Sequence, residues 1–196
     1  MSHDDDTQAL PMRITVSLSS GEAIDVDLYH VQEGTLSDLG YLQRVRSVPV
    51  ELQTKQWFLD LKERYGRLVQ PSCFKLRELI NGPFDGIISP PSSRPELIQP
   101  YRDVLRTKFG ARDLTNHVHS DGSVKAGDKG TTVEQIEASL SVDAIDSIET
   151  ISSLLVVDDV VAEGKTLTAL VRKLVASGLN RRTKISCACV LWVKAR

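Results

Sequence analysis

Residues Leu154 to Leu167 read Leu-Leu-Val-Val-Asp-Asp-Val-Val-Ala-Glu-Gly-Lys-Thr-Leu, and this stretch decides the fold class of the chain. The continuous apolar run at its start is typical of a parallel strand covered on both faces, because neither side of such a strand meets water. We expect this strand over Leu154 to Val157, with Asp158 and Asp159 where it ends. Gly164 then permits a tight turn, and a helix is predicted from Leu167 to Ser177.

The turn after the strand has the features of an anion-binding loop. The backbone amides of Ala162, Glu163, Gly164, Lys165 and Thr166, together with the Thr166 hydroxyl, could converge on an anion at the positive end of the helix. Asp158 and Asp159 would then accept hydrogen bonds from a diol. The stretch therefore predicts a site for a sugar phosphate, with the ribose hydroxyls on the acids and the 5′-phosphate in the loop.

The same residues allow two other interpretations. A buried strand, acidic turn and amphipathic helix of some other α/β protein would explain the apolar residues, but not the whole string Asp-Asp-x-x-x-x-Gly-x-Thr. Gly164-Lys165-Thr166 alone resembles the end of a Walker loop. In that loop, however, the glycines follow the strand directly with no acid pair between, so a nucleoside triphosphate site is not indicated.

Length and composition favour one well-packed α/β domain. The chain has 196 residues, of which 41% are hydrophobic and 26% are charged. Its formal charge of −2 provides no field that would attract nucleic acid or an anionic membrane. The acidic start, Met-Ser-His-Asp-Asp-Asp, lacks the basic and apolar parts of a signal peptide, and no long apolar run is present. We therefore expect a cytoplasmic protein without a membrane span.

The three cysteines, Cys73, Cys187 and Cys189, form no C-x-x-C pair. This sparse, odd set is expected of reduced thiols in the cytosol. Cys187 and Cys189 lie two residues apart in the apolar stretch from Ile185 to Val193. A strand would direct both to one buried face, so we interpret them as structural rather than redox-active.

The rest of the chain alternates between strand and helix patterns. Such alternation predicts a mainly parallel central sheet in a three-layer α/β/α arrangement, with the ligand beyond the carboxyl ends of the strands. The N-terminal part adds a small appendage, an antiparallel hairpin with helices. The expected elements are a hairpin of Met12–Leu18 and Ala23–Leu28, helices over Gln53–Val69, Pro71–Ile80, Pro95–Gly110 and Thr132–Leu140, and further strands over Phe84–Ser89 and Lys184–Val193.

The segment from Ala111 to Thr132 has almost no apolar periodicity and predicts an unusually long loop. Loops of this length in compact domains tend to be functional or disordered. His117 and His119 have His-x-His spacing, but the segment offers no two further ligands, so a structural metal is not predicted. We place a boundary at residue 80, between an N-terminal region (1–80) and the core (81–196).

The stretch Leu154 to Leu167 resembles the phosphoribosyl pyrophosphate signature of the type I phosphoribosyltransferases. A weaker resemblance, to the bacterial competence-protein branch, is carried by Ile87 to Gly110 and the terminal Val-Leu-Trp-Val-Lys-Ala-Arg. The resemblance implies transfer of a phosphoribosyl group from phosphoribosyl pyrophosphate to a nitrogen acceptor, with pyrophosphate leaving as a Mg²⁺ complex. It also implies that Asp158 and Asp159 contact Mg²⁺ through this substrate. Members of the family are often dimers, so a homodimer is a further expectation.

Two further elements follow from the resemblance. The segment Ser89 to Arg94, which contains Pro-Pro-Ser-Ser-Arg, comes after the first core strand, as the family's pyrophosphate loop does. Pro91, Ser92, Ser93 and Arg94 are therefore assigned to pyrophosphate. A plain proline turn before the next helix is the alternative. Asp113 to Thr132 takes the place of the family's flexible catalytic loop. Lys125 and Lys129 lie within this segment, and Arg112 lies at its base. These three residues are candidates to neutralise the charge of the leaving pyrophosphate. The alternative is that they are ordinary solvated charges.

The chain departs from the family pattern at two positions. Purine-salvage members commonly have an aspartate where this chain has Ala162, and alanine cannot take a proton from a base. Glu163 stands where the family has a small or hydroxyl residue, and its carboxylate would repel a phosphate unless it pairs with a cation such as Lys165. These departures leave the acceptor unidentified. They also keep open a non-catalytic module that binds ribose phosphate and acts through a protein partner.

Residues 1–80 are the material from which a hood over the acceptor could be built. Trp57, Phe58 and Tyr65 could stack on a base, although aromatic residues at helical spacing are more often part of a core. The chain has no helix-turn-helix pattern or basic patch, so direct DNA binding is not expected.

Overall fold

The computed structural model describes residues 11–34, 56–92, 95, 98–124 and 130–193. In the first part of the long helix it describes mainly the backbone. The strands are β1 Met12–Ser17, β2 Ala23–Gly34, β3 Gly86–Ile88, β4 Arg112–Asp113, β5 Val118–Ser120, β6 Leu140–Val142, β7 Ser153–Val161 and β8 Lys184–Val193. The helices are α2 Gln56–Leu79, α3 Gln99–Phe109, α4 Val133–Ser139 and α5 Lys165–Ala176, with short 3₁₀ turns at Thr115–His117 and Ile148–Thr150.

The central sheet is mainly parallel, as the sequence predicted. Its strand order is β1-β2-β8-β7-β3-β4, and every neighbouring pair is parallel except β1 with β2. The chain goes from β3 to β4 on one side and then returns to β7 on the other side of β3. In open α/β sheets, ligands bind beyond the carboxyl ends of the strands where the order reverses in this way. The topology therefore points to the ends of β3 and β7.

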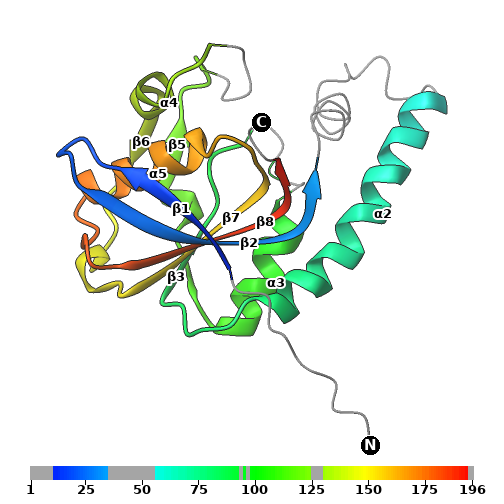
Figure 1. Cartoon of the computed structure of the whole chain (residues 1–196), viewed down its shortest axis with the longest axis horizontal. Helices are drawn as coiled ribbons and strands as arrows, with labels where there is room; N and C mark the ends of the chain where they lie inside the picture. The colour runs from blue at the N-terminus through cyan, green and yellow to red at the C-terminus, as the bar shows by residue number, and fades with distance from the viewer. Residues whose placement is uncertain (1–10, 35–55, 93–94, 96–97, 125–129, 194–196) are drawn as a thin grey trace, which may run out of the picture.

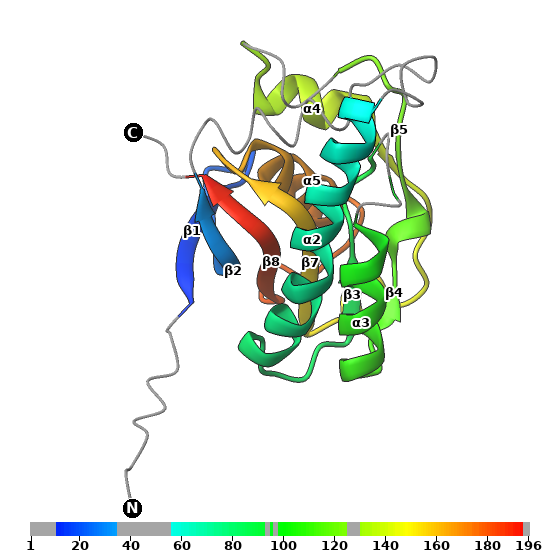
Figure 2. The same cartoon turned by 90° about the vertical axis from the view of Figure 1, so that its right-hand side faces the viewer.

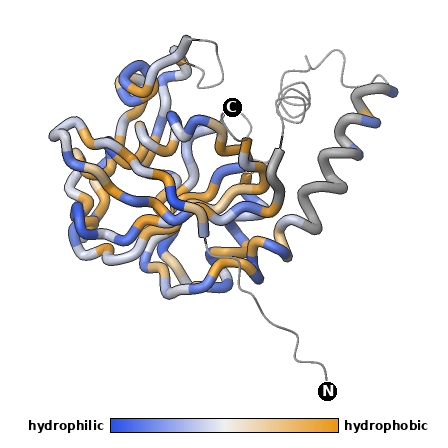
Figure 3. The backbone as a smooth tube through the Cα atoms, in the orientation of Figure 1, coloured by the Kyte–Doolittle hydropathy of each residue, from blue (hydrophilic) through white to orange (hydrophobic). Residues whose placement is uncertain are grey.

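Two apolar clusters cover the sheet. Leu154 and Val156 of β7 belong to the first cluster, which includes buried residues of α4 and α5, whereas Leu155 and Val157 belong to the second, with residues of α2 and α3. Side chains alternate along a strand, so these clusters lie on opposite faces. Figures 1 and 2 show α2 and α3 together on one side of the sheet and α5 on the other. Hydrophobic segments accordingly run through the centre of the molecule in Figure 3.

The N-terminal hairpin is present, but its predicted place as an appendage is wrong. β2 pairs in parallel with β8 over Val26↔Ile185 to Gly34↔Val193, so the hairpin supplies two strands of the central sheet. Val16, Val26 and Leu28 are fully or almost fully buried in the first cluster. The central sheet therefore contains strands from both sides of the boundary that was placed at residue 80. The apolar face of the hairpin is buried on the same side of the sheet as α5.

Two helices predicted before residue 80 are a single helix, α2, which continues through Pro71. It ends at Leu79, before Asn81-Gly82-Pro83, as expected. Lys108 of α3 donates hydrogen bonds to the carbonyls of Arg77 and Ile80, the latter at 2.6 Å. This lysine satisfies carbonyl groups at the end of α2 and fastens α3 to it.

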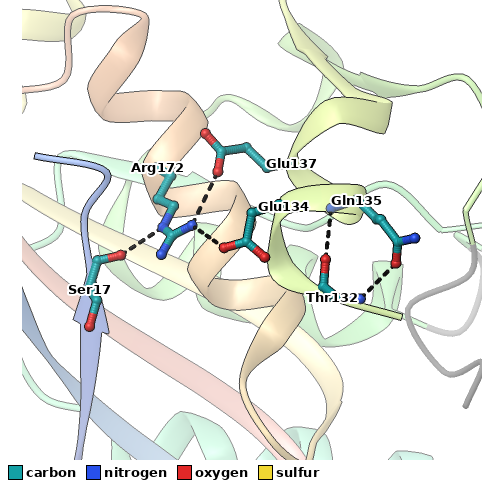
Figure 4. Close-up of polar contacts among 6 residues, drawn as sticks. All are labelled: Ser17, Thr132, Glu134, Gln135, Glu137 and Arg172. Atoms are coloured by element: carbon teal, nitrogen blue, oxygen red, sulfur yellow. Dashed lines mark hydrogen bonds and ion pairs between the residues drawn. The ribbon is translucent and has the colours of Figure 1, made fainter. Parts of the chain in front are cut away.

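The predicted long loop between Ala111 and Thr132 is partly ordered as strands. β4 adds to the edge of the central sheet, while β5 pairs with β6 in a separate antiparallel pair from Val118↔Val142 to Ser120↔Leu140. Local sequence did not indicate these strands because each is three residues or shorter and depends on a distant partner. The helix predicted after the loop is α4, which begins with a capping box between Thr132 and Gln135 (Figure 4).

Strand β8 agrees with its predicted bounds. All three cysteines are buried free thiols, and Cys187 and Cys189 lie in the same cluster, as their spacing predicted. Burial, with the negative charge of Asp158, raises the pKa of the Cys189 thiol far above its usual range. No helix in the described part of the chain is both long and apolar enough to cross a bilayer.

Candidate functional site

Strand β7 extends further than the sequence predicted. It runs from Ser153 to Val161, so Asp158 and Asp159 lie within the strand and not after its end. Its pairing with β3 stops at Val156, while its pairing with β8 continues to Val161. The two acids therefore lie beyond the end of β3, at the edge where the topology predicts a ligand.

The two carboxylates differ in their surroundings. Asp159 is 3% exposed, whereas Asp158 is half-buried and its Oδ1 accepts a hydrogen bond of 2.8 Å from the Asp159 backbone N–H. Neighbouring residues in a strand direct their side chains to opposite faces. Asp158 lies on the face of Cys187 and Cys189, whose pKa values its charge helps to raise. A ligand at this edge would thus meet one acid on each side of the sheet.

The turn after β7 is short and ends in a left-handed glycine. Gly164 has φ +70 and is the N-cap of α5, which begins at Lys165. No side-chain cap occupies the start of this helix among the described residues. The first-turn amides of a helix without such a cap are available to an anion. Thr166 is half-buried in this first turn.

Glu163 and Lys165 form an ion pair across the turn. The Lys165 Nζ lies 2.6 Å from Glu163 Oε2, and both side chains are partly exposed. The pairing with Lys165 is the arrangement that would reduce repulsion between Glu163 and a bound phosphate. Ala162, the other departure from the family pattern, is half-buried and offers only its backbone.

A cavity of about 260 Å³ lies at the carboxyl ends of β3 and β4. Pro91 and Ser92 of the predicted pyrophosphate loop line it, while Ser93 and Arg94 lie outside the described residues. The other lining residues come from the segment between β3 and α3, from Arg102 of α3, from Thr115 after β4 and from β5. Ser89, the first residue of the predicted pyrophosphate segment, is among them. Arg102 and Thr115 also line the cavity, and the sequence did not indicate them because no local motif joins them to that segment.

Arg112 does not lie with these groups. It pairs with Gly86 in the sheet, and Gly86 in turn pairs with Leu154, so Arg112 is level with the start of β7. At about 3.3 Å per residue, this is roughly 13 Å from Asp158 along the strand direction. Its guanidinium donates to the Asp146 carbonyl at 2.7 Å. Lys125 and Lys129 lie outside the described residues, so their assignment stays a prediction.

The described residues include no group of three or more His, Cys, Asp or Glu side chains that could together hold a metal ion. His119 instead lies 2.9 Å from Asp143, through Nε2 and Oδ2. A carboxylate is a suitable oxygen ligand for Mg²⁺, which usually takes one or two carboxylates together with substrate phosphates. Either Asp158 or Asp159 would fit as a carboxylate that shares Mg²⁺ with a substrate phosphate. Their side chains lie on opposite faces of the sheet, so the two carboxylates do not chelate one ion together.

Comparison with known proteins adds little to this geometry. No protein-family model matches the chain, and no curated protein matches it. Among solved structures, a similar one is adenine phosphoribosyltransferase from Thermoanaerobacter pseudethanolicus, at 17% identity and a TM-score of 0.41. The match covers 62% of this chain and 78% of that one. Similarity at this level assigns neither an activity nor a ligand to this chain.

Proposed function

We propose that the chain is a type I phosphoribosyltransferase-like protein of three-layer architecture that binds phosphoribosyl pyrophosphate at the end of β7. The observation that carries this proposal is the unit formed by the projecting end of β7, Gly164 and the uncapped start of α5. Asp158 and Asp159 would accept hydrogen bonds from the ribose hydroxyls. The backbone of Ala162 to Thr166 would bind the 5′-phosphate.

The proposed reaction is substitution at carbon 1 of the ribose. The bond from carbon 1 to the pyrophosphate oxygen breaks, a bond to the acceptor nitrogen forms, and that nitrogen loses a proton. When bound with the substrate, Mg²⁺ would neutralise part of the charge on the departing pyrophosphate. Pro91 to Arg94 are proposed to bind the pyrophosphate, and Lys125 and Lys129 to offset its developing charge. Arg112 is not included, because it lies level with the start of β7.

Anchoring the 5′-phosphate away from the reacting carbon would fix the orientation of the sugar. Ala162 offers no side-chain base, so the acceptor would have to lose its proton to another group or to water. This favours an acceptor whose nitrogen is already nucleophilic over purine salvage through an acid at this position. The homodimer implied by the family resemblance stays a prediction.

A non-catalytic module that binds ribose phosphate is the second candidate. The observation that favours it is the Glu163–Lys165 ion pair in the phosphate-binding turn. A carboxylate beside the phosphate lowers affinity, and a lysine engaged with it has less charge to offer the ligand. Such a module would keep the acids and the loop but would not release pyrophosphate.

Titration calorimetry with phosphoribosyl pyrophosphate and Mg²⁺ tests the proposal. We expect saturable binding to the native chain and at least a ten-fold loss in Asp158→Asn/Asp159→Asn. The matched control is Asp25→Asn/Asp27→Asn, which makes the same charge change on β2 and should bind normally. Absence of binding to the native chain, or an equal loss in the control, would contradict the proposed site.

A pyrophosphate-release assay against pooled bases and amines then separates the two candidates. Release that depends on one acceptor identifies a transferase. Binding that depends on the acid pair, without release in any pool, identifies the binding module.

A further inference from the structure

The loop that the sequence assigns to pyrophosphate is rich in proline. Pro90 and Pro91 belong to it and Pro95 follows it, and all three line the cavity at the carboxyl ends of β3 and β4. Proline has no backbone N–H, whereas backbone concavities that bind anions do so through successive N–H groups. A pyrophosphate bound in this cavity would therefore need donors from other parts of the chain as well.

Arg102 of α3 can supply such donors. It lines the cavity, its side chain is 15% exposed, and its Nε lies 3.3 Å from Asp113 Oδ2. Asp113 Oδ1 accepts a hydrogen bond of 2.9 Å from the Thr115 N–H, so this carboxylate is itself held in place. The ion pair therefore orients the guanidinium through Nε and leaves the N–H donors of its two terminal amino groups for a ligand.

Two residues with hydroxyl groups line the cavity together with Arg102. Ser89 is 3% exposed, and its Oγ has no hydrogen-bond partner among the described residues. Thr115 Oγ1 accepts a hydrogen bond of 3.1 Å from the Ser89 backbone N–H and keeps its own proton to donate. Burying a hydroxyl without a partner costs stability, so Ser89 indicates an acceptor that the described residues do not supply.

The lining of the cavity favours an anion with several oxygens. The described residues that line it include no Asp or Glu, and Ser92, His119 and Ser120 add further polar side chains. Asp113, behind this lining, already contacts Thr115 and Arg102. The polar groups come from the predicted pyrophosphate segment, from α3 and from β5, so they bound the 260 Å³ volume on more than one side. An arginine fork among hydroxyls matches phosphate oxygens.

The cavity lies next to the proposed ribose site. Ile88 of β3 pairs with Val156 of β7, so Ser89 is about one residue step short of Asp158 on the neighbouring strand. With strands about 4.8 Å apart and residues about 3.3 Å apart along each strand, the two backbones are on the order of 6 Å from each other. A ribose held by Asp158 could therefore direct a group on its carbon 1 into the cavity.

We propose that Arg102, oriented by Asp113, binds the pyrophosphate group of phosphoribosyl pyrophosphate together with Ser89 and Thr115. This inference rests on the proposed function, and it adds a fixed arginine of α3 and a threonine after β4 to the predicted pyrophosphate loop. The Arg102 guanidinium would offset the negative charge that develops on the pyrophosphate oxygen as its bond to carbon 1 breaks. It stays protonated throughout, so no proton passes through it.

The test uses the two halves of the substrate as separate probes. Inorganic pyrophosphate and ribose 5-phosphate are each titrated, without Mg²⁺, into the full chain labelled with ¹⁵N and followed by nuclear magnetic resonance. We expect pyrophosphate to give saturable shifts of the Ser89 and Thr115 amide signals, and ribose 5-phosphate to give them at Gly164 and Thr166. Inorganic phosphate should bind at Ser89 and Thr115 at least ten-fold more weakly than pyrophosphate. Equal binding of these two anions, or no saturable shift with pyrophosphate, would overturn the inference.

Two variants locate the pyrophosphate site. Arg102→Lys keeps the positive charge beside Asp113 but loses the fork, and should weaken pyrophosphate binding ten-fold or more. Ser89→Ala removes a hydroxyl that has no described partner, so the chain should stay folded while pyrophosphate binds several-fold more weakly. Arg106→Lys, one turn along α3 and exposed, is the matched control and should bind normally. Unchanged affinity in both cavity variants, or the same loss in Arg106→Lys, would overturn the inference.

A cross-comparison separates this inference from the proposed function. Arg102→Lys should keep its affinity for ribose 5-phosphate, whereas Asp158→Asn/Asp159→Asn should lose ribose 5-phosphate and keep pyrophosphate. Equal loss of both probes in Arg102→Lys would mean a general structural effect and would overturn the inference.

The native chain distinguishes the two failures. If it binds ribose 5-phosphate but not pyrophosphate, the inference fails and the proposed ribose phosphate site stands. If it binds pyrophosphate through Arg102 but not ribose 5-phosphate, the proposed function fails and the assignment of Arg102 to pyrophosphate stands.

Discussion

Lys165 Nζ and Glu163 Oε2 lie 2.6 Å apart across the turn that joins β7 to α5. This ion pair places a carboxylate at the rim of the proposed phosphate site and engages the lysine that starts the helix. The pair is partly exposed, so it adds little to folding stability. Its main effect should be on the affinity for an anion.

Replacing Glu163 with serine should strengthen binding of phosphoribosyl pyrophosphate by several-fold. The change removes a negative charge from the site and releases Lys165 toward the phosphate. Titration calorimetry at low ionic strength measures the effect, which salt should reduce. Glu149→Ser, an exposed acid in the turn before β7, is the control and should change affinity little. The same gain in both variants would mean a general charge effect.

Replacing Gly164 with alanine should reduce both stability and binding. Its φ of +70 disfavours any other residue, at a cost of about 1 kcal/mol, while the added methyl would meet only an ordinary contact with Ile14. Gly110→Ala is the matched control, because φ is +63 there and the position caps α3. Urea unfolding should show similar losses for both, but only Gly164→Ala should lose affinity for phosphoribosyl pyrophosphate. Equal loss of affinity in both variants would contradict the role of the turn.

Asp85 should make stability depend on pH in the acid range. Hydrogen bonds from the Ser152 hydroxyl and the Ser152 and Ser153 backbone N–H groups lower the pKa of the Asp85 carboxyl. The lowered pKa means that the stabilisation is fully present above the usual value near 4 and is lost as the pH falls through the folded-state value. Asp85→Asn should destabilise the chain by about 1 kcal/mol near neutral pH and less below pH 4.

Urea unfolding measured from about pH 7 to about pH 2 checks this dependence. Asp103→Asn, whose carboxylate makes no hydrogen bond among the described residues, is the control. A stability difference between the native chain and Asp85→Asn that stays constant across the range would refute the predicted pH dependence.

Arg172 should be needed to hold α4 and β1 against α5. Its guanidinium donates to the Ser17 carbonyl at 2.6 Å and lies 3.1 Å from Glu134 and 3.4 Å from Glu137 (Figure 4). Arg172→Leu should cost about 1–3 kcal/mol of unfolding free energy, because three acceptors lose a mostly buried donor. Arg172→Lys should recover part of the loss. Exposed Arg182→Leu is the control, and an equal loss there would argue against a specific role.

Some of the fold could be predicted from the sequence because its signals are local. The apolar run of β7, the apolar strand β8, the hairpin around Ser19 to Gly21 and the capping residues of α4 each depend on neighbouring residues. Short-range periodicity and turn chemistry are sufficient for elements of this kind. The turn at Gly164 belongs with them, since Gly164 and the start of α5 form one continuous stretch.

Predictions that needed long-range pairing were less accurate. Nothing local in Ala23 to Gly34 shows that β2 pairs with β8, about 160 residues later in the chain, so the hairpin was predicted to be an appendage. Pro71 indicated a break that α2 does not have, because the packing of the folded chain can override even the local cost of a proline within a helix. β4 and β5 were not predicted as strands for a similar reason, since each is short and depends on a partner strand.

The sequence by itself determined the α/β class, the mainly parallel sheet and the strand–turn–helix unit with Gly164 in its turn, because these depend on residues close together in the chain. Tertiary structure alone decided that the two acids lie beyond β3 on opposite faces, that Arg112 lies at the far end of the strands, and that Ser89, Arg102 and Thr115 meet around one cavity. The physical reason is that parallel pairing and helix packing join residues far apart in sequence, and no local pattern records which strand lies beside which.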